Sequence, residues 1–78
     1  MALSVEVLRE IRDELNWRVI TLETEAENLR EEAEYITMPE ESAEMRRRAA
    51  VRSDVEAAKV RGLIASVEEE LGREKADT

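Results

Sequence analysis

The sequence has no cysteine, histidine or phenylalanine, and its 78 residues include one proline and two glycines. Without cysteine the chain cannot form a disulfide, and without cysteine or histidine it lacks the usual ligands of structural zinc. The same absence removes thiol nucleophiles and imidazole bases from any catalytic site. Two isolated glycines, Gly62 and Gly72, cannot form a glycine-rich phosphate-binding loop. We therefore expect no metal, no cofactor and no enzymatic activity.

Long apolar runs and an excess of positive charge are also absent. No stretch approaches the roughly 20 apolar residues that span a bilayer, and the N-terminal sequence MALSVEVLRE does not resemble a signal peptide. Arginine and lysine total 12 against 20 aspartate and glutamate, which gives a net charge of −8. This charge argues against binding to nucleic acid or to an anionic membrane. We expect a cytoplasmic protein.

Two long helical patterns lie on either side of the single proline, Pro39, at the midpoint of the chain. In residues 4–36, apolar residues recur every three or four positions, which predicts one face of a helix. They are Leu8, Ile11, Leu15, Val19, Leu22, Ala26, Leu29, Ala33 and Ile36. Ser4 is a suitable N-cap, and Glu6 places a carboxylate in the first turn, where it interacts favourably with the helix dipole.

A turn is predicted at residues 37–39. Thr37 and Glu40 form the T-x-x-E pattern of a capping box for the second helix. Pro39 suits the first turn of that helix, because the N–H group that it lacks would have no partner there.

The second helix is predicted over residues 38–71. Its core stripe takes steps of three and four through Ala50, Ser53, Ala57, Val60, Ile64, Val67 and Leu71. Gly72 is typical of a C-cap, so residues 72–78 are expected to form a flexible tail after the hairpin of residues 1–71.

Residue size and charge both favour an antiparallel register, as a short connection requires. Folding about residue 38 brings Leu22, Ala26 and Leu29 opposite the small residues Ala50 and Ser53, and sets larger residues opposite one another near the termini. Six glutamates in residues 23–34 then lie beside Arg46, Arg47, Arg48 and Arg52, and Glu68, Glu69 and Glu70 lie near Arg9 and Arg12. The same pairing could occur within one chain or between two subunits.

A hairpin of this size has little interior of its own. Ordering costs roughly 1.5 kcal/mol per residue, which the burial available to so small a chain barely offsets. The predicted fold is therefore an all-α, coiled-coil-like hairpin that dimerises into a four-helix bundle.

Each helix carries a second stripe away from its core stripe. The first contains Trp17, Thr21, Thr24, Asn28, Glu31 and Tyr35, and the second contains Val51, Val55, Ala58, Gly62 and Ala65. Small residues around a glycine allow two helix backbones to approach closely, and Trp and Tyr are frequent at binding hot spots. We predict that one stripe forms a homodimer and the other binds a different protein, although both could instead face the inside of one bundle.

A catalytic alternative rests on carboxylates alone. Glu40, Glu41 and Glu44, with Glu74 and Asp77, resemble the EExxE…ExxD metal-binding pattern of the all-helical nucleotide pyrophosphohydrolases. The hairpin separates the two groups by roughly 45 Å, at 1.5 Å per residue, so only a site shared between subunits could reunite them. Solvated helix ends explain these residues more simply.

The charged segments suggest one further alternative. Arg46, Arg47 and Arg48 could contact phosphates, but no aromatic residue lies among them for base stacking. The acidic surface could instead imitate DNA, as in a phage or mobile-element inhibitor of a host enzyme. The hypothesis that the sequence favours most is a non-enzymatic module that self-associates and binds or scaffolds another protein.

Overall fold

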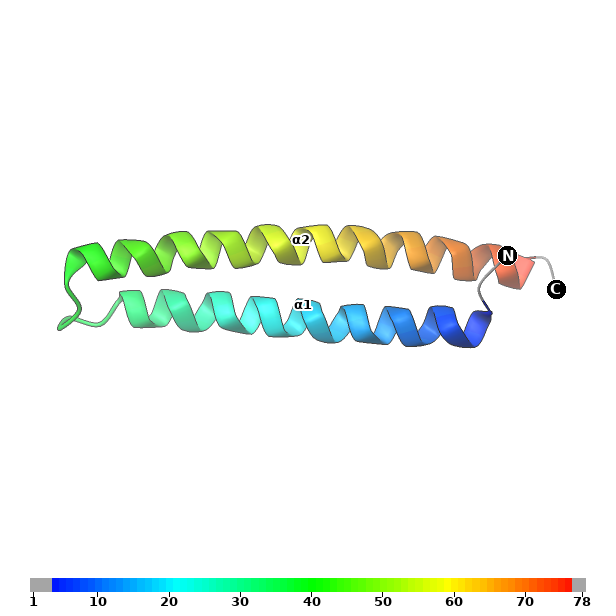
Figure 1. Ribbon diagram of the computed structural model, residues 1–78, viewed down its shortest axis with the longest axis horizontal. Coiled ribbons are helices and arrows are strands. Elements are labelled where there is room, and N and C mark those ends of the chain that lie inside the picture. The colour runs from blue at the N-terminus through cyan, green and yellow to red at the C-terminus, as the bar shows by residue number, and fades with distance from the viewer. Residues whose placement is uncertain (1–3, 77–78) are drawn as a thin grey trace.

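Two α-helices form an antiparallel hairpin in the computed structural model, which describes residues 4–76 (Figure 1). α1 (Val5–Ala33) and α2 (Glu40–Ala76) lie side by side, with the connection at one end and the start of α1 and the end of α2 at the other. The hairpin measures 59 × 17 × 14 Å. The predicted all-α hairpin is confirmed.

α1 begins as the sequence predicts. The Ser4 side chain accepts a hydrogen bond from the backbone N–H of Val7 at 3.2 Å, and Ser4 itself has an extended backbone. This bond satisfies one of the N–H groups that have no partner inside the helix.

α1 ends three residues earlier than predicted. The N–H of Glu34 donates to the carbonyl oxygen of Glu31 at 3.1 Å, and the N–H of Tyr35 donates to that of Glu32 at 3.2 Å. These bonds span three residues and tighten the end of the helix. Carboxylates are unfavourable at the negative end of the helix dipole, which explains why this glutamate-rich segment stops the helix. Ile36 therefore lies outside α1 and is fully exposed, and its assignment to the core stripe was wrong.

α2 begins at Glu40, two residues later than predicted. The carbonyl oxygen of Pro39 accepts a hydrogen bond from the N–H of Ala43 at 3.0 Å, so Pro39 stands at the N-cap position. A residue that precedes proline is disfavoured in the helical region, which keeps Met38 out of the helix. Thr37 is therefore too early in the chain to cap α2, and the predicted capping box was wrong. Residues 34–39 connect the helices with no positive φ angle, so this turn needs no glycine.

α2 continues past Gly72 to Ala76, and the predicted C-cap at Gly72 was wrong. Arg73 binds Glu69 at 2.8 Å and Glu70 at 3.1 Å, and these two ion pairs bridge the glycine on the helix surface. Such pairs support a helix by a few tenths of a kcal/mol each, against about 1 kcal/mol for the glycine. The last two residues of the expected tail, 77–78, lie outside the described residues.

The interior changes character along the hairpin. Alanines fill the half near the turn, and larger side chains fill the half near the chain ends. The buried residues are Ala26, Ala33, Ala43, Ala50 and Ala57 in the first half, and Leu8, Val19, Val60 and Leu71 in the second. Ala26 and Ala50 have no exposed surface, so the backbones approach closely where the side chains are smallest.

Ion pairs across the hairpin agree in part with the predicted charge register. Arg46 binds Glu32 at 3.0 Å, as the predicted charge blocks require, and two further pairs, Arg30 with Asp54 and Arg61 with Glu23, also join the helices. All three pairs are partly exposed, and such pairs contribute about 0–1 kcal/mol.

Other predicted partners bind elsewhere. Arg47 and Arg48 bind Glu40 and Glu44 on their own helix. Near the chain ends, Glu69 and Glu70 bind Arg73, and Arg12 binds Asp13 at 3.5 Å. Within residues 4–76 no ion pair joins this acidic segment to Arg9 or Arg12, because oppositely charged residues of the same helix stand closer.

Candidate protein-interaction surfaces

The second stripe of α1 faces away from α2. We call Trp17, Thr21, Thr24, Asn28 and Glu31 the Trp17 face; all five residues are exposed. Trp17, Thr24 and Glu31 each lie two residues before a buried residue, namely Val19, Ala26 and Ala33. At about 100° per residue this offset is a rotation of about 200°, so the Trp17 face lies opposite the core of the hairpin.

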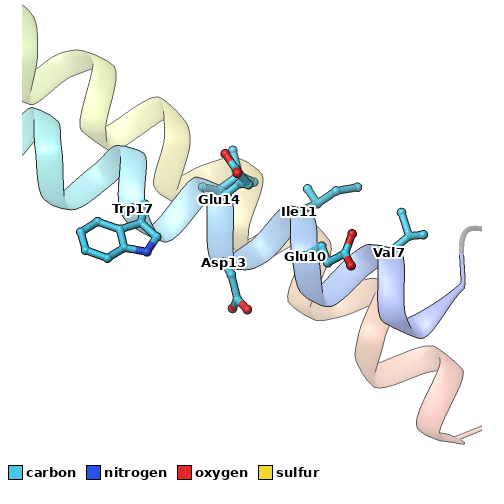
Figure 2. A pocket seen from close by; sticks show the side chains of 7 residues that line it. Val7, Glu10, Ile11, Asp13, Glu14 and Trp17 are labelled. Atoms are coloured by element: carbon cyan, nitrogen blue, oxygen red, sulfur yellow. The ribbon is translucent and has the colours of Figure 1, made fainter.

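Trp17 is the most prominent side chain of this face. Its side chain is 69% exposed, and its indole ring points away from α2 (Figure 2). Thr21 donates a hydrogen bond from Oγ1 to the carbonyl oxygen of Trp17 at 2.9 Å, which restrains the Thr21 rotamer. Ile20 is 54% exposed next to them, and its apolar surface adds to that of the indole. Ile20 was not among the predicted interaction residues, although its spacing of three residues from Trp17 was a usable signal.

Two shallow recesses meet at Trp17. The first has a volume of about 540 Å³, and Figure 2 shows side chains that line it along the N-terminal part of α1. The second has a volume of about 720 Å³ and extends from Trp17 toward the turn. Apolar groups come from Val7, Ile11, Leu15, Trp17, Ile20 and Leu29. Polar groups come from Thr21, Thr24 and Asn28.

The charged residues that line the recesses are all acidic. The first recess has Glu10, Asp13 and Glu14, and the second has Glu25 and Glu32. No lysine or arginine lines either recess. Glu32 is neutralised by Arg46 and Asp13 by Arg12. The two recesses at Trp17 therefore combine aromatic and aliphatic surface with an excess of carboxylates.

The second stripe of α2 is also turned outward. We call Val51, Val55, Ala58, Gly62 and Ala65 the Val55 face; all five residues are exposed, Val51 at 57% and Val55 at 50%. Val55 precedes buried Ala57 by two residues, and Gly62 follows buried Val60 by two. Apart from the adjacent residues and the nearby backbone of α2 itself, no heavy atom lies within 4 Å of the position that a Cβ atom would take at Gly62, so this part of the face is open.

The two faces point to opposite sides of the hairpin, because each is turned away from the other helix. A single partner surface therefore cannot cover both at once. Nine of the ten predicted interaction residues lie on these faces. Tyr35 does not: it is 61% exposed but lies in the connection, beyond the end of α1.

The carboxylates of the catalytic alternative stay apart. Glu40, Glu41 and Glu44 lie at the turn end of α2, and Glu74 lies at its other end. Asp77 is outside the described residues. Within residues 4–76, no three Asp, Glu, His or Cys side chains are grouped so that they could hold a metal ion.

Neither described helix has an apolar stretch long enough to cross a bilayer. No protein family, curated protein or solved structure matches the chain.

Proposed function

We propose that the chain is a non-enzymatic protein-interaction module that dimerises through its Val55 face into a four-helix assembly and binds another protein through its Trp17 face. The observation that carries this proposal is the distribution of apolar side chains. The core is mostly alanine, whereas Trp17, Ile20, Val51, Val55 and Leu63 are at least half exposed. Large apolar side chains on an outer face favour burial against a partner.

The accessible surface supports self-association. It amounts to 6117 Å², whereas a compact monomer of 9.0 kDa would have about 4,900 Å² by the usual scaling with mass. The difference is larger than the roughly 800 Å² that each partner buries in a standard interface.

The Val55 face suits pairing with itself. A two-fold dimer brings the same patch of both subunits together. The alanines and the glycine of the face permit close packing of two α2 helices. In an antiparallel pair centred on Ala58, the basic segment at Arg47 and Arg48 lies beside Glu68 and Glu69 of the second subunit. This arrangement brings opposite charges together at both ends of the interface.

Light scattering at micromolar concentration tests the dimer. The wild-type chain is expected to have the mass of two subunits, and Val55→Asp is expected to shift it toward one, because each dimer would bury two carboxylates against apolar surface. Asn16→Asp is the matched control, since it adds the same charge at an exposed position of α1, away from the Val55 face. A stable monomer for the wild-type chain, or an equal shift for both variants, would contradict dimerisation through this face.

A further inference from the structure

The two recesses on α1 combine apolar surface with negative charge, and this combination specifies a class of partner. Three of the five carboxylates that line them, Glu10, Glu14 and Glu25, have no basic partner among the described side chains. A basic side chain placed there would meet carboxylates that form no ion pair within the hairpin. The indole of Trp17, exposed where the recesses meet, can also accept a cation against its ring face.

We propose that the Trp17 face binds a basic amphipathic helix of another protein. The apolar side of that helix covers Trp17 and Ile20, and its lysines or arginines reach Glu10, Glu14 and Glu25. The recesses extend from Val7 to Glu32, and at about 1.5 Å per residue they match a helix of roughly 25 residues. Helices that dock in this way present apolar residues every three or four positions.

This inference rests on the proposed function, since it names the partner of the Trp17 face. A second copy of the chain is a poorer occupant. The basic residues nearest the Val55 face are Arg48, Arg52 and Lys59, on the side of the hairpin opposite the Trp17 face, and two of them already bind Glu44 and Glu56. Pairing the Trp17 face of one copy with the Val55 face of the next would repeat without closing and would produce an open filament.

Trp17 is the only tryptophan of the chain, so its fluorescence reports directly on the proposed site. The probe is a synthetic amphipathic helical peptide of leucine and lysine, and its counterpart of leucine and glutamate is the comparison. The basic peptide is expected to shift the emission of Trp17 to shorter wavelength in a saturable manner, and added salt is expected to weaken it. The acidic peptide is expected to cause no shift.

Two double variants separate a specific site from a general effect of net charge. Glu10→Gln with Glu14→Gln removes two carboxylates from the first recess and is expected to weaken the basic peptide about tenfold. Glu34→Gln with Glu41→Gln changes the net charge equally, but its two residues are exposed near the turn, outside both recesses. This control is expected to change the affinity less than twofold. Trp17→Ala, measured by calorimetry, is expected to weaken binding by a similar factor of about ten.

Three results would overturn the proposal. The two double variants could weaken the peptide equally, the acidic peptide could bind as well as the basic one, or the Trp17 emission could shift with protein concentration alone. The last result would show that a second copy covers the face. Val55→Asp is expected to retain peptide binding, so failure of the dimer and failure of the Trp17 face can be observed separately.

Discussion

The half of the hairpin near the turn (the turn half) and the half at its other end (the open half) hold their helices together in different ways. Alanines line the turn half, where Ala26 and Ala50 are fully buried, whereas Leu8 and Leu71 close the open half. An alanine side chain removes little apolar area from water, so the turn half depends on close fit between backbones. The open half depends on the area of its larger side chains. Replacement of a large core side chain by a small one should therefore destabilise the open half. Replacement of a small core side chain by a large one should destabilise the turn half.

The largest effect is expected from Leu8→Ala in the open half. Leu8 is 3% exposed, and loss of a buried leucine costs roughly 2–5 kcal/mol in the free energy of unfolding, with the lower end expected near a helix terminus. Urea titration followed by circular dichroism at fixed protein concentration measures the loss. Val7→Ala is the control: Val7 is 40% exposed, so its truncation should cost less than about 1 kcal/mol. Equal losses would contradict the assignment of Leu8 to the core.

A smaller loss is expected from Ala50→Leu in the turn half. The added side chain has no space between the helices and must displace them, which costs about 1–3 kcal/mol. Arg52→Leu, at an exposed position of the same helix, should change the free energy of unfolding by less than about 0.5 kcal/mol. The same urea titration checks both variants. If Ala50→Leu were as stable as the wild-type chain, the close approach of the two backbones would be wrong.

Sequence periodicity predicted the core well because a helical stripe depends only on local spacing. Every predicted core residue from Leu8 to Ala33 and from Ala50 to Leu71 is buried or half-buried. The helix ends were harder to predict, since several local signals compete there. At the turn, the restriction that Pro39 places on Met38 outweighed the capping box of Thr37. At the C-terminal end, α2 continues through Gly72 to Ala76, although glycine often ends a helix.

The interaction surfaces were predictable as stripes but not as one site. Spacing alone showed that Trp17, Thr21 and Thr24 share a face, and likewise Val51, Val55 and Ala58. Their placement on opposite sides of the hairpin depends on which residues of each helix are buried against the other. The acidic lining of the recesses could not be predicted from the stripes alone. Residues such as Glu25 and Leu29 line the second recess but belong to a neighbouring strip of the helix.

The smallest effects are expected from the ion pairs that join the helices, and they provide the finest comparison of the two halves. Glu32→Gln breaks the pair with Arg46 in the turn half, and Glu23→Gln breaks the pair with Arg61 farther along. Both should cost less than about 1 kcal/mol in the free energy of unfolding, because a partly exposed ion pair is only slightly more stable than its two side chains hydrated separately. The Arg46 side chain is 36% exposed and that of Arg61 is 60% exposed, so water screens the second pair more. Glu32→Gln should therefore lower the urea midpoint more than Glu23→Gln, and the reverse order would contradict the greater screening of the pair between Glu23 and Arg61.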